Sequence, residues 1–338
     1  MKAIVLQEPG KFAHTTRDDV SDVPPGSALV RVRRTGICGT DWHAFHGRQP
    51  FFTYPRVLGH ELGVEVERVN DPNSDLKPGD KCSVEPYLNC GTCIACRRGK
   101  TNCCTSLNVI GVHSDGGMCE RLVLPARKLH RSSKLSLDQL ALVETLAIGC
   151  HAVARASVEP KENVLIIGAG PIGLSVIPFV RAAGAEPIVA DVSESRLAFC
   201  RQHMNVTHTL DARQDVKAQL ATLLNGDLPT AVLDATGNPK SMAGTFDLIA
   251  HAGRIILVGL FQGDVTFNDP NFHRREITLM ASRNALPGDF KSIIKLIEDG
   301  KVDTTPWITH RTPAAGLLDV LPAWLAPDAN VIKAMIEF

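Results

Sequence analysis

The stretch that decides the fold of this 338-residue chain is Val164-Leu165-Ile166-Ile167-Gly168-Ala169-Gly170-Pro171-Ile172-Gly173. Its apolar start is typical of a buried β-strand, and residues 171–183 continue with the pattern of a helix. The three glycines between them fit G-x-G-x-x-G, in which they allow a tight turn, a close backbone approach to a pyrophosphate and helix–strand packing. The start of the helix then presents N–H groups to the phosphates. The glycines could form only a tight loop, but the strand–turn–helix setting favours a dinucleotide site.

Asp191 follows the next apolar strand, at residues 187–190. Its carboxylate can accept hydrogen bonds from the adenosine ribose hydroxyls and would repel a 2′-phosphate, which favours NAD over NADP. Arg196 weakens this preference for NAD, because a nearby guanidinium could neutralise Asp191 or stack on adenine.

Further apolar strands at residues 231–233, 255–258 and 277–280 alternate with amphipathic helices. Continuous apolar strands of this kind predict a parallel sheet covered on both faces. We therefore expect a doubly wound α/β domain over residues 150–287.

The first part of the chain has a different, β-rich pattern, because residues 28–33 alternate apolar and charged side chains. After residue 293 the chain reads as a helix, a loop around Pro306, another helix and a final strand at 331–336. A lone strand is unstable by itself. We expect it to join the first part, which gives a discontinuous domain made of residues 1–149 and 288–338.

Four cysteines in one loop, near residues 90–104, follow the pattern C-x2-C-x2-C-x7-C: Cys90, Cys93, Cys96 and Cys104. Four compact thiolates can close a tetrahedral shell around structural Zn²⁺. Spacing alone leaves Cys103 open as the fourth ligand in place of Cys104. A redox or disulfide cluster is the alternative. A reducing cytosol, the compartment that we expect for this protein, disfavours that alternative.

Two polar islands lie beside apolar strands, Gly36 to His43 and Gly59 to Glu61. In them Cys38, His60 and Glu61 offer a thiolate, an imidazole and a carboxylate, a set suited to zinc. Each would more often be a structural residue if it stood alone. Their occurrence together with the glycine pattern and the four-cysteine loop favours a metal site.

The composition narrows the class of protein. It is 44% hydrophobic and 21% charged, and 36 basic residues balance 36 acidic ones, which gives no overall field for nucleic acid or anionic membranes. The N-terminus lacks the pattern of a secretory signal. The longest uncharged stretch, 164–180, is interrupted by glycine and proline and is predicted to be a strand, a turn and a helix rather than a membrane span. We expect a cytoplasmic protein with no nucleic-acid or membrane partner.

Taken together, these motifs resemble the zinc-dependent medium-chain dehydrogenase/reductase family over the whole chain. The resemblance implies a GroES-like, discontinuous catalytic domain and a Rossmann cofactor domain, and it implies NAD-dependent alcohol oxidation by a homodimer or homotetramer. It also implies that Cys38 and His60 bind a catalytic zinc. A structural zinc would be bound by Cys90, Cys93, Cys96 and Cys104.

The segment around Glu144 is similar to the sorbitol and threonine dehydrogenase branch, in which Glu61 and a glutamate equivalent to Glu144 serve the zinc. Thiolate, carboxylate and neutral His60 bring Zn²⁺ to a formal charge of zero. Direct ligation by Glu144 as well would make the site anionic and weaken its Lewis acidity. Our hypothesis is that Glu144 holds the zinc-bound water or exchanges with it.

The proton of the substrate hydroxyl is expected to leave through Thr40 towards His43, whose pKa range suits a shuttle. His43 could instead be an exposed loop histidine. Asp41 is expected to orient His60 by accepting its other ring proton.

The substrate is predicted to be a polyol or a sugar acid. Arg283 matches a polyol-contacting position of sorbitol dehydrogenase-like enzymes and could clamp a carboxylate. His113 lies in a stretch similar to threonine and sugar-acid dehydrogenases. Either residue could instead lie on the surface or between domains. The alternatives for the whole chain are an L-threonine 3-dehydrogenase and a nucleotide-binding sensor without turnover.

Overall fold

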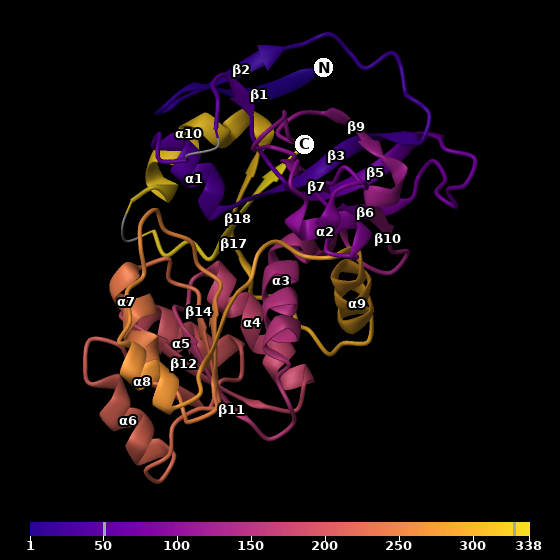
Figure 1. Ribbon diagram of the computed structural model, residues 1–338. Helices are drawn as coiled ribbons and strands as arrows, with labels where there is room; N and C mark the ends of the chain where they lie inside the picture. The colour runs from indigo at the N-terminus through magenta and orange to yellow at the C-terminus, as the bar shows by residue number, and fades with distance from the viewer. Residues whose placement is uncertain (50–51, 327–328) are drawn as a thin grey trace. The chain divides into compact units, whose positions relative to one another are not determined.

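A computed structural model describes residues 1–49, 52–326 and 329–338. The chain divides into two compact units, residues 1–145 with 286–338 and residues 146–285 (Figure 1). Each unit has its own sheets and its own hydrophobic core.

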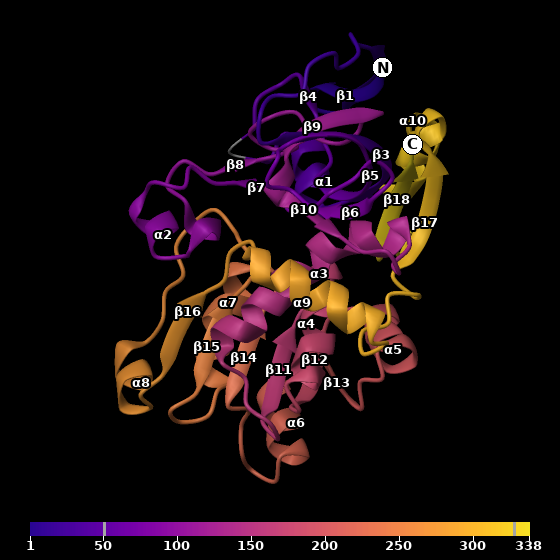
Figure 2. The ribbon, with the colours of Figure 1, turned by 90° about the vertical axis from the view of Figure 1, so that its right-hand side faces the viewer.

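The second unit is built on a six-stranded parallel sheet. Its strands are β11 (Asn163–Ile167), β12 (Glu186–Asp191), β13 (His208–Asp211), β14 (Ala231–Asp234), β15 (Arg254–Leu257) and β16 (Thr278–Ala281). They lie in the order β13-β12-β11-β14-β15-β16, as Figure 2 shows side by side. The order reverses between β11 and β14, which confirms the predicted doubly wound fold and creates the switch point where such sheets bind ligands.

Helices connect these strands: α4 (Pro171–Ala182), α5 (Glu194–His203), α6 (Val216–Leu223), α7 (Pro239–Gly244) and α8 (Asp269–Arg274), with a 3₁₀ turn at Thr245–Asp247. Their starts follow local rules. Pro171 opens α4, where a missing N–H costs nothing, and the side chain of Asp215 caps α6 by accepting from the N–H of Ala218. The polar edge strand β13 was not predicted, because its sequence, HTLD, lacks an apolar run.

The first unit is organised around the long strand β3 (Ser27–Ile37). One edge of β3 pairs with β5 (Glu61–Asn70); the other pairs first with β9 (Arg121–Pro125) and then with β18 (Lys333–Glu337). The same sheet includes β6 (Lys81–Val84), β10 (Leu129–Arg131) and β17 (Ile308–Pro313). Smaller sheets are formed by β1 (Lys2–Glu8), β2 (Lys11–Thr16) and β4 (Arg56–Val57), and by β7 (Tyr87–Leu88) and β8 (Asn108–Val109).

The expected final strand is β18, and its pairing with β3 confirms that the end of the chain joins the N-terminal part (Figure 2). β18 also pairs in parallel with β17, a strand that was not predicted. The sequence of β17, ITHRTP, is half-exposed and mostly polar, so it shows neither strand pattern.

The helices of the first unit are short, apart from α3 (Leu137–Ala156), which continues into the second unit. α9 starts at Pro287, earlier than the expected residue 293, because Asp289 accepts from the N–H of Leu286 and caps it. α3 is long and apolar enough to cross a membrane, but 67% of its apolar window is buried, as in a core helix. The remaining elements are α1 (Gly39–Phe45), α2 (Ile94–Arg97), α9 (Pro287–Glu298), α10 (Leu317–Trp324) and 3₁₀ turns at Thr101–Cys103, Ala126–Lys128 and Ala314–Gly316.

Candidate active site

Cys38, which is half-buried, and the buried His60 and Glu61 form one donor group in the first unit. Their ligand atoms all lie within 4.8 Å of one another. Pairing of β3 with β5 causes this, because Gly36 lies opposite Glu61, and Cys38 directly follows β3. A side chain at Gly36 would place its Cβ 2.2 Å from Glu61 Oε2, so glycine is required there.

The surroundings of His60 favour a positive charge. Burial opposes protonation of the ring, but Cys38, Asp41 and Glu144 outweigh it and hold the pKa of His60 well above its usual value. The same anions would attract a metal cation in place of the proton. A metal ion is therefore a natural occupant of this donor group.

Asp41 lies beside His60 without a hydrogen bond to it. His60 Nδ1 and Asp41 Oδ1 are 3.9 Å apart, and both atoms are buried with no hydrogen-bond partner. The other carboxylate oxygen, Asp41 Oδ2, accepts from the N–H of Cys38 at 2.8 Å. The orienting role of Asp41 stays a prediction that needs the two side chains to approach by about 1 Å.

Thr40 and His43 lie three residues apart on α1, on the same face of the helix. Thr40 is half-buried and His43 is exposed. This placement gives a path from a buried group towards solvent, as a proton relay needs. Their catalytic roles stay predictions.

Lys333 forms a buried ion pair with Glu61 that sequence reasoning missed. Lys333 Nζ lies 2.6 Å from both carboxylate oxygens of Glu61 and 3.3 Å from the carbonyl oxygen of Ile37. Both charged side chains are 1% exposed. A charged residue within the apolar run of β18 was the available signal, because a buried ammonium needs a counterion.

Glu144, on α3, is the second buried carboxylate of this cluster. Burial raises the pKa of Glu144, and the negative charge of Glu61 raises it further. His60 and a hydrogen bond from Tyr87 lower this pKa, but the net effect is an increase. In that bond the Tyr87 hydroxyl donates to Glu144 Oε1. Tyr87 is another site residue that the sequence did not reveal.

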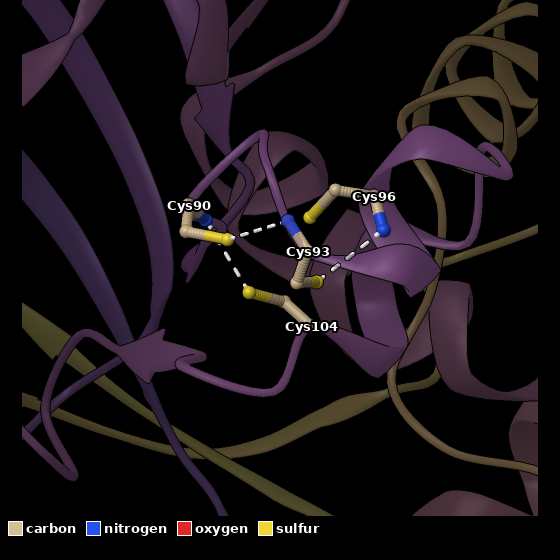
Figure 3. A group of neighbouring side chains, drawn as sticks. All are labelled: Cys90, Cys93, Cys96 and Cys104. Carbon is tan, nitrogen blue, oxygen red and sulfur yellow. Dashed lines mark hydrogen bonds between the residues drawn. The ribbon is translucent and has the colours of Figure 1, made fainter.

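The four-cysteine loop forms a second donor group. The Sγ atoms of Cys90, Cys93, Cys96 and Cys104 lie within 4.8 Å of one another, and Figure 3 shows them pointing towards a common centre. Cys103 is exposed and outside the group, so the structure selects Cys104 as the fourth donor. All four group members are free thiols.

Backbone N–H groups point at these sulfur atoms. The N–H groups of Cys93 and Cys96 lie 3.4 Å and 3.5 Å from the sulfurs of Cys90 and Cys93, respectively. Such hydrogen bonds lower the pKa of Cys90 to about 7 and that of Cys93 to about 5. The loop therefore stabilises the thiolates of Cys90 and Cys93, the form that binds metal, whereas hydrogen bonds with the neighbouring cysteines and burial raise the pKa of Cys104.

The glycine loop has the geometry of a phosphate cradle. Gly168 has φ of +95°, which favours glycine, and a Cβ at Gly173 would lie 1.7 Å from the carbonyl oxygen of Gly168. Gly170, Pro171 and Ile172 complete the turn into α4. The loop follows β11, beside the point where the strand order reverses.

Asp191 ends β12 and braces this loop. Its two oxygens accept from the N–H groups of Ala169, at 2.6 Å, and Ser193, at 2.7 Å. Arg196 Nη1 donates to the carbonyl oxygen of Ala169 at 3.2 Å rather than pairing with Asp191. Arg196 therefore forms no ion pair with Asp191 at the edge of the cradle.

His113 and Arg283, the predicted substrate residues, belong to different units. Both are exposed. His113 Nδ1 accepts from the N–H of Val109 at 3.0 Å, which leaves Nε2 to carry the ring proton. Arg283 follows the edge strand β16. Their shared role stays a prediction.

Comparison with known proteins identifies the relatives of this chain. Residues 24–134 match the model of the alcohol dehydrogenase GroES-like domain, and residues 171–299 match that of the zinc-binding dehydrogenases. The chain is 40% identical to L-galactonate-5-dehydrogenase of Escherichia coli K12 over 341 residues, which covers 100% of this chain and 99% of the relative. This chain belongs to the zinc-binding dehydrogenase family.

Two further similarities support the assignment. L-threonine 3-dehydrogenase of Pyrococcus horikoshii is 31% identical over 92% of this chain and 91% of its own length. The crystal structure of the alcohol dehydrogenase rspB from Escherichia coli CFT073, complexed with NADH, has a TM-score of 0.93 and 26% identity, and the match covers 100% of this chain and 99% of that one. The resemblance and the fold class predicted from the sequence are confirmed.

The donor groups of this zinc-binding dehydrogenase fit the metal of its family. One thiolate, one imidazole and one carboxylate suit an open catalytic zinc site, and four thiolates suit a closed structural one.

Proposed function

We propose that this chain is a zinc- and NAD-dependent dehydrogenase that oxidises a secondary hydroxyl of a sugar acid or polyol. The observation that carries the proposal is the donor group of Cys38, His60 and Glu61 in a chain 40% identical, over its full length, to L-galactonate-5-dehydrogenase. The reaction converts one secondary alcohol and one NAD⁺ into a ketone, NADH and a proton.

When bound, zinc would supply a Lewis acid for the substrate hydroxyl, and nicotinamide would supply the hydride acceptor. Cys38, His60 and Glu61 hold the metal at the end of β3 and the start of β5. Thr40 receives the hydroxyl proton and passes it towards His43, which releases it to solvent. The half-buried and exposed positions of these two side chains support this direction.

Residues 168–173 and the N–H groups at the start of α4 would hold the pyrophosphate of the cofactor. Asp191 accepts from the ribose hydroxyls and disfavours a 2′-phosphate. Arg196, held by the carbonyl oxygen of Ala169, does not neutralise that carboxylate and therefore does not remove the preference for NAD.

The substrate carries a carboxylate or several hydroxyls. An arginine guanidinium such as that of Arg283 can bind a carboxylate through two parallel hydrogen bonds, which favours a sugar acid such as an aldonate. His113, whose Nδ1 accepts from the N–H of Val109, is a second proposed substrate residue. The proposal includes a cytoplasmic homodimer or homotetramer, for which sizing in solution is the test.

A panel of aldonates, polyols and L-threonine, assayed for NADH formation with and without chelator, tests this function. We expect aldonates or polyols to reduce NAD, NADP to be used poorly, and chelation of the metal to abolish turnover. Oxidation of L-threonine alone would assign an L-threonine 3-dehydrogenase, which the 31% identical relative makes the second candidate. Failure of every substrate with the zinc-loaded enzyme would contradict the proposal and favour a nucleotide-binding sensor.

A further inference from the structure

Besides Asp41, two buried carboxylates lie around the candidate metal site, those of Glu61 and Glu144, and they have different partners. Lys333 contacts both oxygens of Glu61 and neutralises its charge. Tyr87 contacts one oxygen of Glu144, Oε1, through a neutral hydroxyl. Tyr87 therefore leaves the second oxygen of Glu144 without this contact, while its hydroxyl restricts the rotation of the carboxyl group.

The Tyr87 ring is held from several sides. It belongs to β7, where it pairs with Val109 of β8, and it is 2% exposed. Its ring packs edge-on against Phe290, with centroids 6.3 Å apart and planes at 71°. Phe290 in turn stacks on His130 at 4.9 Å. The hydroxyl is thus fixed in place by packing rather than by Glu144 itself.

The network behind this ring is also buried and bonded. His130 Nε2 lies 3.1 Å from Glu85, whose other oxygen accepts from Lys128. All three side chains are at most 5% exposed. Burial and the neighbouring Glu144 raise the pKa of Tyr87 well above its usual value, so the hydroxyl stays a proton donor. Glu144 therefore meets a rigid, permanent donor at Oε1.

We propose that Tyr87 is a positioning residue that holds Glu144 beside the catalytic metal and prevents it from becoming a permanent ligand. The proposal rests on the proposed function, in which Glu144 acts next to the metal. Without the hydroxyl, the carboxyl group of Glu144 would be free to rotate towards the cation. Tyr87 then controls how many ligands the metal has, without touching substrate or cofactor.

The test is Tyr87→Phe, which keeps the ring and its contact with Phe290 but removes the hydroxyl. The enzyme carries zinc in the four-cysteine loop and Co²⁺ in the catalytic site, so that the visible spectrum reports the ligands of the catalytic ion alone. We expect weaker, shifted cobalt bands, as higher coordination produces, and slower loss of metal to a chelator. With the best substrate, kcat should fall 10–100-fold, the range for partners of metal-site groups, with KM changed much less.

Tyr54→Phe is the matched control, because the Tyr54 hydroxyl donates to a backbone carbonyl, that of Ala44, at 2.5 Å. It should leave the cobalt spectrum unchanged. Tyr87→Phe is also made in the Glu144→Gln background, where its spectral effect should disappear if Tyr87 acts through Glu144.

A wild-type cobalt spectrum in Tyr87→Phe, or a shift of equal size in the Glu144→Gln background, would overturn the proposal. Because the spectrum needs no turnover, it decides the role of Tyr87 even if the substrate panel contradicts the proposed function. If Tyr87→Phe fails to fold, Glu144→Gln becomes the test. A wild-type cobalt spectrum and an unchanged kcat in Glu144→Gln would overturn the proposal, because Glu144 would then have no role for which Tyr87 could position it.

Discussion

Replacement of Lys333 by methionine tests the charge balance of the candidate site. Methionine keeps the length and apolar character of the lysine stem and removes the ammonium. In the wild-type protein that ammonium has three oxygen acceptors, two on Glu61 and one on Ile37, and no access to solvent. The variant leaves the Glu61 carboxylate buried near Cys38 and Glu144 without its ion-pair partner, and His60 is then the one neighbour among the described residues of the site that can carry a positive charge in the metal-free protein.

The size of the effect follows from that burial. Removing one partner of a buried ion pair costs about 3–5 kcal/mol, since the remaining charge is uncompensated. For a unit of about 200 residues this corresponds to a fall in Tm of roughly 10 °C. Zinc should restore part of the loss, because a divalent cation can take over the compensation of Glu61.

Urea unfolding of the metal-free and zinc-loaded forms measures both quantities. The double variant Lys333→Met/Glu61→Gln is the control, since it removes both charges, and it should be more stable than Lys333→Met alone. A loss below about 1 kcal/mol in the metal-free single variant, the level of an exposed pair, would refute the reasoning. So would a double variant no more stable than the single one.

Three further predictions address the other parts of the site. Cys96→Ser should reduce bound zinc by one ion per chain in elemental analysis and leave the catalytic ion in place; if both ions are lost, the two sites are not independent. In the metal-free protein, zinc uptake by the cysteine loop should weaken as pH falls from about 7 to about 5, because protonation of Cys90 and then of Cys93, whose pKa values are about 7 and about 5, removes the thiolates. Asp191→Asn should raise KM for NAD about tenfold, the effect of losing one charge-assisted hydrogen bond, and should reduce the preference for NAD over NADP. An unchanged ratio of kcat/KM for the two cofactors would exclude Asp191 from cofactor selection. His43→Ala should flatten the pH–rate profile, and a profile identical to wild type would exclude His43 from the proton path.

Local patterns predicted the parts of the fold and site that depend on neighbouring residues. The glycine loop and the four-cysteine loop each lie within one short segment, so their spacing in the sequence fixes their geometry. Cys38 and Glu61 come together because β3 and β5 pair in register. The sequence indicated apolar strands beside both residues but not the pairing of those strands. Strands β13 and β17 were missed because both are edge strands with mostly polar sequences, which show neither an apolar run nor an apolar–polar alternation.

The partners of the two carboxylates could not be predicted in the same way. Lys333 lies 272 residues from Glu61 in the sequence, and Tyr87 lies 57 residues from Glu144. Neither contact belongs to a motif with fixed spacing. Each depends on which strand ends meet in the folded unit, and that is decided by the pairing of β18 with β3 and by the placement of β7 against α3.

Lys333 also changes the charge argument made from the sequence. From the sequence we expected Glu144 in an outer position, because Cys38, Glu61 and Glu144 together would give a zinc site a net negative charge. The buried ammonium adds one positive charge, so three anions, Lys333 and Zn²⁺ sum to zero with neutral His60. Charge alone therefore no longer separates the roles of Glu61 and Glu144.

What separates them is the kind of partner each carboxylate has: a cation that occupies both oxygens of Glu61, and a neutral hydroxyl that occupies one oxygen of Glu144. The hydrogen bond from Tyr87 is thus the feature on which an outer position for Glu144 depends.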